Sequence, residues 1–387
     1  MNIGEIHFTY IELSWLLVLL VAFFFQLYFY LRYIAGVLRH RRHIRKGKIK
    51  FQEHQPPVSV VICARDEEEN LRKFLPLILE QDYPEYEVIV VNDASMDYTD
   101  DYLSLMTKQC PNLHTTFVPA GATNLSTKKL GLTLGIKAAK YDLLLFTDAD
   151  CMPEGRNWIA SMVRNFNPET EFVLGYGGYL KKKGLLNTLI KYDTLFIALQ
   201  YLGMAIARKP YMGVGRNLAY RSETFFRMKG FASTLHLQSG DDDLMVNRGA
   251  TGRNTAVEIS SESVTWSVPK NTFKQWFIQK ERHLSVSNQY STTSKFSLIL
   301  EPLSRAVFYL AIIFAAIFGN WISLAAAGFI FVLRYTMQAI IINKSAKQLG
   351  EQRFFLSILL LDILLPLITL YILVFGRTKK KKGLKWK

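Results

Sequence analysis

The chain contains 387 residues, carries a formal net charge of +15, and is 50% hydrophobic. Two short segments, 39–50 and 377–387, each contain seven Arg or Lys and no acidic residue, so the remainder of the chain is close to neutral. This distribution excludes a general nucleic-acid-binding protein, because such proteins carry basic residues across their folded surface. The three cysteines form no CxxC pair, which argues against a disulfide framework.

An uncharged apolar segment runs from Trp15 to Leu31 near the start of the chain. With its flanks it is long enough to cross a bilayer, and it lacks the short core and cleavage site of a secretory signal. We therefore predict a retained transmembrane anchor over residues 1–38 and a basic juxtamembrane linker over residues 39–56. Because basic residues beside a span favour the inner face of the cell membrane, the domain that follows is expected in the cytoplasm.

Strands and helices alternate in the next part of the chain, residues 57–265. Continuous apolar runs predict buried strands, and amphipathic patterns between them predict helices: strands at 58–64, 87–91 and 141–150, helices at 67–81 and 130–140. This alternation predicts an α/β domain with a mostly parallel sheet and right-handed crossovers. Ligands of such sheets bind at the carboxyl ends of the strands, where NDAS (92–95) and DAD (148–150) lie.

The chain becomes more apolar toward its C-terminal half. We expect a strand within 171–184 and an unusually apolar amphipathic helix over 185–209. The segment 272–284 mixes aromatic and basic residues, as helices at a membrane interface do, so residues 266–302 predict an interfacial amphipathic region. These two helices suit a lipid-linked acceptor at the bilayer surface, or alternatively they pack on the membrane spans.

The last apolar stretch, residues 303–376, predicts transmembrane helices that end in the basic tail, 377–387. Three crossings there would place the tail outside the cell, whereas the positive-inside rule favours the cytoplasm. One apolar segment is therefore expected not to cross. The segment 306–319 is the candidate, because it is shorter than the ~20 residues of a usual span.

Asp148 and Asp150 stand one residue apart at the end of an apolar strand. Two carboxylates this close repel each other unless a cation lies between them. Oxygen ligands suit Mg²⁺ or Mn²⁺, and such ions share their coordination with substrate phosphates, so the pair predicts a metal–diphosphate site. The alternative is structural, because both aspartates could cap a helix or solvate a turn.

A second acidic cluster, SGDDDLMVNRG, spans residues 239–249. Its acids suit the first turn of a helix, and they equally suit catalysis, because an ionised aspartate can accept a proton from a hydroxyl group. Both interpretations stay open from the residues alone. The chain contains no HExxH, GxSxG or GxxxxGK[ST] segment, so the enzyme classes that use those motifs are not supported.

Six segments, in this order, resemble membrane-anchored family 2 glycosyltransferases of the inverting GT-A type: VVICARDEEENL, VIVVNDASMDYT, KKLGLTLGIKAAKYDLLLFTDADCMP, GRNLAYRSETF, GDDDLMVNRG and QKERH. The resemblance covers residues 57–290. It implies a GT-A domain over 57–265, Rossmann-like with a mostly parallel sheet, in a cytosolic position flanked by transmembrane helices. It also implies a UDP- or GDP-linked sugar donor and a Mg²⁺ or Mn²⁺ cofactor.

The resemblance assigns roles to single residues. Asp150 and Asp148 resemble the metal-and-diphosphate motif, and Asp242 falls at the position of the general base, with Asp241 in support. Lys128 has the family spacing to Gly135 for a lysine that faces the diphosphate, although Lys129 is the alternative. The other assigned positions are Ala64, Arg65, Glu67 and Asp93 on the nucleotide side and Asn217 and Arg221 on the acceptor side.

The segment QKERH resembles the QxxRW segment of polysaccharide synthases and some lipid glycosyltransferases. Gln279 and Arg282 match it, and Arg282 is expected to pair with the departing diphosphate. His283 replaces the tryptophan on the acceptor side, which removes a stacking platform for an acceptor sugar. A smaller departure is Asp66, which stands where the family usually has asparagine.

Together these features predict a metal-dependent enzyme that transfers a sugar to a lipid or lipid-linked acceptor at the membrane. Two other interpretations stay open. A processive polysaccharide synthase needs a membrane channel, which four apolar segments and His283 do not favour. A transporter or a non-enzymatic scaffold is not favoured either, because the spans hold few charged residues and both acidic motifs are intact.

Overall fold

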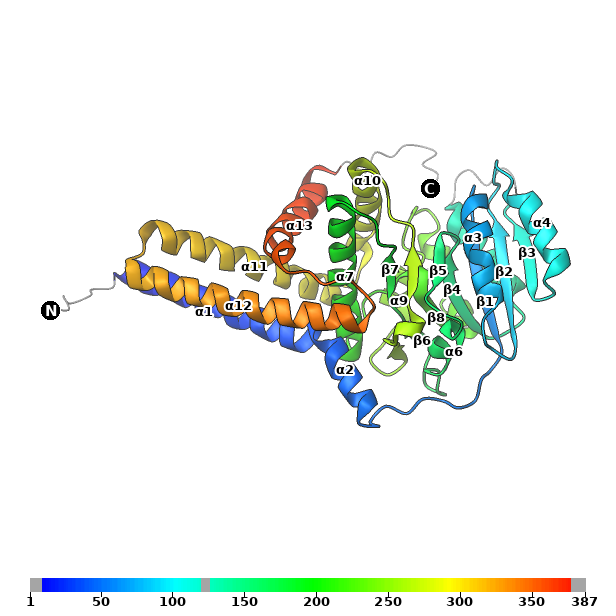
Figure 1. Cartoon of the computed structure of the whole chain (residues 1–387), viewed down its shortest axis with the longest axis horizontal. Coiled ribbons are helices and arrows are strands. Elements are labelled where there is room, and N and C mark those ends of the chain that lie inside the picture. The colour runs from blue at the N-terminus through cyan, green and yellow to red at the C-terminus, as the bar shows by residue number, and fades with distance from the viewer. Residues whose placement is uncertain (1–8, 120–125, 377–387) are drawn as a thin grey trace.

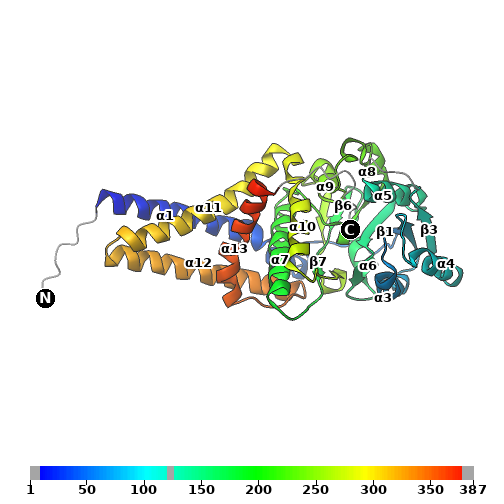
Figure 2. The same ribbon diagram turned by 90° about the horizontal axis from the view of Figure 1, so that it is seen from above.

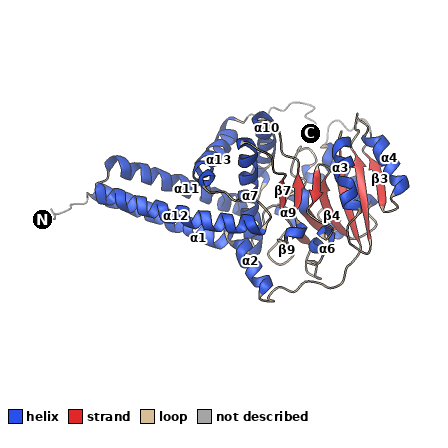
Figure 3. Cartoon of the chain, in the orientation of Figure 1, coloured by secondary structure: helices blue, strands red, loops and turns tan. Residues whose placement is uncertain are grey.

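The computed structural model describes residues 9–119 and 126–376. The predicted basic tail, 377–387, lies outside the described residues, as do residues 1–8 of the predicted anchor. The described chain has two parts along its long axis (Figure 1). An α/β domain contains all the strands, and long helices project from one side of it (Figure 3).

A seven-stranded sheet forms the centre of the α/β domain. Its strands lie in the order β3-β2-β1-β4-β8-β6-β9, and only β8 runs antiparallel to its neighbours. The predicted Rossmann-like, mostly parallel sheet is therefore confirmed. The strands are β1 (Val58–Ala64), β2 (Tyr86–Asn92), β3 (Leu113–Phe117), β4 (Leu143–Asp148), β6 (Phe172–Leu174), β8 (Leu218–Arg221) and β9 (Thr255–Val257).

Helices cover both faces of the sheet: α3 (Glu68–Leu79), α4 (Thr99–Gln109) and α6 (Trp158–Val163) on one, α5 (Thr127–Ala138) and α7 (Leu185–Ile206) on the other. Along β1, Val60 and Ile62 point into the core under α3, α4 and α6. Val61 and Cys63 point into the core on the other face, under α5 and α7. A strand covered on both faces needs a continuous apolar sequence, which explains the run at 58–64.

A second, three-stranded sheet lies beside the large one. In it β10 (Thr265–Ser267) pairs antiparallel with β5 (Cys151–Pro153) and parallel with β7 (Gly177–Tyr179). The strand expected within 171–184 is therefore two short strands, β6 in the large sheet and β7 in the small one. Because β5 begins directly after Asp150, the small sheet reaches the acidic pair at the end of β4.

The helix α7 is an interior helix. Most of its residues are buried, and it packs against the π-helix η1 (Tyr30–Ile34) and α2 (Gly36–Arg45). Gly203 permits this crossing, because a Cβ atom there would lie 1.9 Å from the carbonyl oxygen of Tyr33. The surface-helix interpretation of 185–209 is therefore wrong, and the packing interpretation is confirmed.

The helices α1 (Tyr10–Phe29), α11 (Thr292–Phe318) and α12 (Trp321–Gln348) lie side by side and form a three-helix bundle (Figure 2). At its far end the rings of Trp15 and Phe314 stack with centroids 4.2 Å apart. The segment 306–319 is no short separate element, because it belongs to the continuous helix α11. The reason for expecting that segment not to cross is therefore wrong.

Two further helices lie near the base of the bundle, α10 (Phe273–Leu284) and α13 (Leu356–Phe375). The short helices α8 (Ser222–Arg227) and α9 (Asp243–Gly249) belong to the α/β domain. Within the described ranges, five helices are long and apolar enough to cross a membrane: α1 with η1, α7, α11, α12 and α13. Since α7 is interior, the other four are the membrane candidates.

Candidate active site

Three neighbouring strands of the large sheet end at one edge, and the candidate site lies there. β1 pairs with β2 so that Ala64 lies opposite Asn92, and with β4 so that Cys63 lies opposite Asp148. The carboxyl ends of such parallel strands form the usual ligand-binding edge. Several of the predicted residues therefore share this edge: Ala64, Arg65, Glu67, Asp93, Asp148 and Asp150.

Arg65 and Asp93 form an ion pair on the β1–β2 side of the edge. The guanidinium lies 3.3 Å from the carboxylate, and both residues are buried. The backbone N–H of Asp93 also donates a hydrogen bond to the carbonyl of Ala64 at 2.8 Å. These contacts hold the Asp93 carboxylate in one place at the edge of the sheet.

The chain turns sharply between β1 and α3. Asp66 has a φ angle of 49°, in the left-handed region that asparagine and aspartate tolerate better than most residues. Its carboxylate accepts a hydrogen bond from the backbone N–H of Met96 at 2.6 Å. The backbone N–H of Glu67 donates to the hydroxyl of Thr99 at 3.1 Å. Replacement of the usual asparagine by Asp66 therefore preserves the turn.

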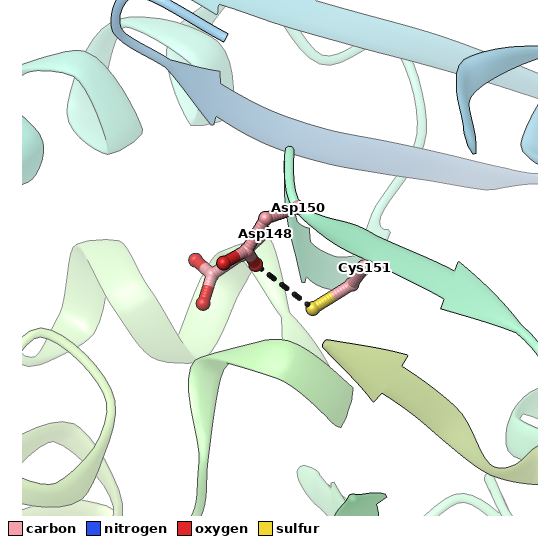
Figure 4. Close-up of side chains that lie close together, drawn as sticks. All are labelled: Asp148, Asp150 and Cys151. Carbon is pink, nitrogen blue, oxygen red and sulfur yellow. Dashed lines mark hydrogen bonds between the residues drawn. The ribbon is translucent and has the colours of Figure 1, made fainter. Parts of the chain in front are cut away.

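Asp148, Asp150 and Cys151 form a compact group whose ligand-type atoms all lie within 4.8 Å of one another (Figure 4). Asp150 accepts hydrogen bonds from the hydroxyl of Ser267 at 3.0 Å and the thiol of Cys151 at 3.4 Å. Burial and the neighbouring Asp148 raise the pKa of Asp150, and a divalent cation would relieve this repulsion. Burial also raises the pKa of Cys151 well above its usual range. The thiol therefore stays protonated, and the paired carboxylates are the donors that suit Mg²⁺ or Mn²⁺.

Lys128 connects the two acidic motifs. Its ammonium group lies 3.0 Å from Asp148 and 3.0 Å from Asp241. Burial opposes the charge of Lys128, but the carboxylates of Asp148, Asp241 and Asp242 raise its pKa well above the usual value. Lys128 is therefore charged, and it holds the loop before α9 against the end of β4.

Lys129 points in the other direction and is fully buried. Its ammonium group donates hydrogen bonds to three backbone carbonyls, those of Thr234 at 2.7 Å, Leu237 at 3.1 Å and Ser239 at 2.7 Å. The alternative that Lys129 faces the diphosphate is therefore wrong. Lys129 instead holds the chain that leads into the acidic cluster, a role that the sequence prediction missed.

Asp242 is the N-cap of α9, so the capping interpretation is confirmed. Its carboxylate accepts hydrogen bonds from the backbone N–H groups of Gly215 at 2.6 Å and Asp243 at 2.8 Å. Burial and the adjacent Asp241 raise the pKa of Asp242, which makes its ionised form a better proton acceptor. Asp241 differs, because Lys128 outweighs burial and lowers the pKa of its carboxyl. Capping and proton acceptance are compatible at Asp242.

The helix α10 brings the QKERH segment to the same region. Gln279 donates a hydrogen bond to the hydroxyl of Tyr179 at 3.1 Å, and Arg282 lies 3.5 Å from the ring of His283. His283 is exposed at the protein surface, but the surrounding protein and the positive charges of Arg282, Arg216 and Lys128 lower its pKa. His283 is therefore neutral at pH 7 and adds no charge to this cationic region.

Residues 59–222 match the sequence profile of the family described as glycosyl transferase family 2. This segment of the α/β domain therefore carries the sequence pattern of that family. A probable glycosyltransferase of Bacillus subtilis strain 168, YdaM, is 25% identical over 301 residues, which cover 74% of this chain and 67% of that protein. Glycosyltransferase AglE of Haloferax volcanii is 30% identical over 106 residues, which cover 27% of this chain and 33% of that protein.

The chain is also similar in structure to the mannosyltransferase PcManGT from Pyrobaculum calidifontis, solved in complex with GDP-Man and Mn²⁺. The TM-score is 0.51 at 20% sequence identity, and the match covers 86% of this chain and 99% of that one. At this identity the likeness concerns the fold. The predictions of a family 2 chain with a GT-A fold are therefore confirmed.

Arg216 is a residue of the candidate site that the sequence prediction does not include. It lies in the short 3-10 helix η2 (Gly215–Asn217) before β8, with its guanidinium 4.4 Å from the ring centroid of Tyr179. Burial opposes its charge, but the ionisable groups around it, including Asp148 and Asp150, raise its pKa. The only sequence signal is its place in GRNLAYR, one residue before Asn217.

Asn217, predicted on the acceptor side, is fully buried. Its amide nitrogen donates to the carbonyls of Tyr176 at 2.9 Å and Ser263 at 2.6 Å, and its oxygen accepts from the indole N–H of Trp158 at 3.0 Å. Asn217 therefore joins three chain segments beneath the site. Direct contact with an acceptor is not the role of this side chain.

The structure does not bring Arg221 to the site. Because β8 is antiparallel to β4, Arg221 lies opposite Leu143, at the end of the sheet away from Asp148. Its guanidinium pairs with Asp142 at 3.0 Å and donates to the carbonyl of Thr170 at 3.0 Å. In this position Arg221 is a structural residue, and its predicted place on the acceptor side is wrong.

Proposed function

We propose that this protein is a membrane-bound, inverting glycosyltransferase that moves a sugar from a UDP- or GDP-linked donor to a lipid-linked acceptor at the cytoplasmic face of the cell membrane. The observation that carries the proposal is Lys128, which lies 3.0 Å from both Asp148 and Asp241. This lysine joins a diphosphate-type acidic pair to the loop that carries a proton acceptor. Such a combination is what group transfer from a nucleoside diphosphate needs.

In this proposal the parts of the chain have the residue boundaries expected from the sequence. A catalytic GT-A domain is attached to the membrane at both ends, so that its site stays close to the bilayer surface. The parts are an anchor (1–38), a linker (39–56), the GT-A domain (57–265), an interfacial region (266–302), transmembrane helices (303–376) and a basic tail (377–387).

The donor would bind along the carboxyl ends of β1, β2 and β4. The Arg65–Asp93 pair lies where the nucleotide base is expected. Asp148 and Asp150 would hold Mg²⁺ or Mn²⁺, and such an ion neutralises charge on a departing diphosphate. Lys128, Arg216 and Arg282 supply further positive charge to the same group, and the electrostatic support of a leaving group is usually the largest catalytic contribution.

Asp242 is the proposed general base. It takes the proton of the acceptor hydroxyl while that oxygen forms a bond to the anomeric carbon of the sugar. The bond from the anomeric carbon to the diphosphate oxygen breaks, and its electron pair leaves with the diphosphate. Because the hydroxyl attacks from the side opposite the leaving group, the anomeric configuration inverts. The backbone N–H of Gly215, 2.6 Å from Asp242, fixes the direction of the carboxylate.

A lipid-linked acceptor is supported by the position of α10. One side of this helix reaches the site through Gln279, and another contacts α13, where the rings of Phe277 and Tyr371 lie 6.1 Å apart. The interior of the bundle is filled by Leu19, Phe23 and Phe308. This filling favours a single transfer over processive polymer synthesis, which needs a channel.

Transfer by the purified full-length protein in native membrane lipids tests the proposed function. We expect one nucleotide-sugar from a UDP- and GDP-linked panel to yield a lipid-extractable product with a single added sugar, and EDTA to abolish its formation. Mn²⁺ or Mg²⁺ should restore it. A ladder of long chains would show a processive synthase, and no transfer from any donor would contradict the proposal.

We expect Arg216→Gln to lower kcat about 100-fold, the loss typical of removing one charge-stabilising donor from an active site. The matched control is Arg221→Gln, on the same strand segment but at the other end of β8, which should keep kcat within about threefold. Initial rates at saturating donor provide the comparison. Equal losses in both variants would mean that Arg216 acts only through folding.

A further inference from the structure

We propose that α13 does not cross the membrane but lies within the leaflet on the catalytic side, with its outer surface covered by lipid acyl chains. The chain would then cross the membrane three times, through α1, α11 and α12, and the tail after α13 would lie on the same side as the catalytic domain. This inference rests on the part of the proposed function that places the bundle in a membrane. It does not depend on the reaction.

Both ends of α13 lie at the end of the bundle that adjoins the α/β domain. At its start, the backbone N–H of Phe354 donates to Asn343 of α12 at 2.6 Å, and the hydroxyl of Tyr335 donates to the carbonyl of Phe355 at 3.2 Å. Near its end, Tyr371 contacts Phe277 of α10. Figures 1 and 2 agree that α13 runs across the long axis of the bundle. A helix that starts and ends at one level does not span a bilayer.

A buried charged group fixes α13 at this level. Asp362 pairs with Arg305 of α11 at 3.1 Å and Arg334 of α12 at 2.8 Å, and it accepts a hydrogen bond from Gln338 at 2.7 Å. Glu301 balances the second arginine through its contact with Arg305. The group is therefore neutral, as charges within a membrane protein must be to avoid a large cost.

The charged group lies toward the catalytic end of the bundle. Arg305 and Arg334 are each thirteen residues from the outer ends of their helices, Phe318 and Trp321. At 1.5 Å per residue this is about 20 Å, whereas the hydrocarbon core of a bilayer is about 30 Å thick. With the outer ends at the far boundary, Asp362 and α13 lie in the leaflet on the catalytic side.

The exposed surface of α13 indicates which kind of molecule covers it. Its exposed side chains are apolar along the whole helix: Leu356, Leu360, Ile363, Leu367, Leu370, Tyr371, Leu373, Val374 and Phe375. A helix at the water boundary carries a polar outer face, and α13 lacks one in these residues. The apolar surface continues onto the exposed side chains of α11 and α12, such as Leu310 and Val332. Acyl chains are the partner that suits such a continuous surface.

This placement reconciles the charge distribution with the fold. The seven basic residues of 377–387 and the seven of 39–50 then lie on one side of the membrane, as the positive-inside rule favours. The apolar segment that does not cross the membrane is therefore α13 and not 306–319, and the number of crossings is odd. The contact of α13 with α10 also places a lipid-covered helix directly beside the helix that carries Gln279 and Arg282.

Thiol labelling in sealed vesicles tests the side of the tail. Cys110 is partly exposed on the α/β domain and marks the catalytic side, whereas Cys63 and Cys151 are buried. Two variants in a Cys110→Ser background carry either one cysteine appended after Lys387 or Trp321→Cys at the outer end of the bundle. With a membrane-impermeant maleimide, we expect the appended cysteine to label from the same side as Cys110 in the parent protein, and Trp321→Cys to label from the opposite side.

The outcomes separate the two proposals. An appended cysteine that labels together with Trp321→Cys overturns the placement of α13 and leaves the membrane-bound enzyme intact. Removal of the protein from membranes by an alkaline wash overturns both.

Depth measurements test the acyl-chain contact. Spin labels at Leu360, Leu367 and Val374 lie on one face of α13, and the first and last are separated by about 20 Å along the helix. We expect all three to report nearly the same depth, with high accessibility to oxygen. The control pair on α12, Leu324→Cys and Ile340→Cys, should differ by about 24 Å. A steady change of depth along α13, or free access of a water-soluble relaxation agent, would overturn the proposal.

Discussion

Asp242→Asn is expected to lower kcat about 10³-fold, within the range that a general base contributes, while the Kd for the nucleotide-sugar stays within about threefold. Asparagine caps helices as well as aspartate does. Its one oxygen can keep the capping bond from the backbone N–H of Asp243, at the loss of the bond from Gly215, so α9 should keep its start. The groups that face the diphosphate, Lys128 and Asp150, are unchanged. Initial rates and calorimetric titration of the donor measure the two quantities.

The matched control is Asp243→Asn. Burial and the neighbouring Asp242 raise the pKa of Asp243 to about 8, so this carboxyl carries a proton at pH 7. Its two oxygens contact the hydroxyl of Tyr290 at 2.7 Å and the backbone N–H of Leu244 at 2.8 Å. An asparagine can keep both contacts, because its oxygen accepts from Leu244 and its NH2 group donates to the hydroxyl of Tyr290. Asp243→Asn should therefore keep kcat within about fivefold. If Asp242→Asn transfers sugar at the wild-type rate, Asp242 is not the base.

The same assignment predicts the acid limb of the pH profile. A general base works only in its ionised form, and the pKa of Asp242 is raised by burial and Asp241. The rate of the wild-type enzyme should therefore fall, as the pH is lowered, at a higher pH than the ordinary aspartate value of about 3.9 would give.

Asp150→Ala should have the second large effect, on binding instead of transfer. Removing one of two carboxylates from the Asp148–Asp150 pair removes a cation ligand, and we expect the Mn²⁺-dependent part of donor binding to weaken at least about 30-fold, since even indirect changes at metal sites cost 10- to 100-fold. Without a divalent ion, the variant and the wild type should bind the donor with similar, weak affinity. Titrations of donor with Mn²⁺ and with EDTA give the four values.

Cys151→Ser provides the control for Asp150→Ala. The thiol of Cys151 is protonated and donates to Asp150 at 3.4 Å, and a serine hydroxyl can donate the same bond. This variant should keep Mn²⁺-dependent binding within about threefold. Together the variants separate two functions: Asp150→Ala loses binding, and Asp242→Asn loses transfer. Retention of full Mn²⁺ dependence in Asp150→Ala would exclude Asp150 as a ligand.

The sequence by itself determined three strands of the parallel sheet, at 58–64, 87–91 and 141–150, and the edge at which the acids gather. Hydrophobic periodicity is a local property, so the buried run 58–64 and the aspartates at the end of β4 were recognisable without a fold. The six ordered motifs likewise identified the family. Periodicity does not indicate how each element is rotated relative to its neighbours.

Only the tertiary structure decided which of two adjacent lysines faces the site. Lys128 and Lys129 are consecutive on α5, so they point to different sides of the helix, and the partners on each side come from segments about 20 and more than 100 residues away. Arg216 and Arg221 were separated by the same kind of information, because the direction of β8 places one of them at each end of the sheet. Spacing along a chain does not reveal strand direction.

The proposed number of membrane crossings also depends on the tertiary structure. By composition α13 is the most apolar of the long helices, and the sequence therefore predicted a span there. An apolar sequence indicates that a helix avoids water, but it does not indicate in which direction the helix runs relative to the membrane. The contacts of its start with α12 and of Tyr371 with α10 set that direction. The ion pairs of Asp362 with Arg305 and Arg334 fix the depth of the helix, since a buried charge is stable only where its partners are.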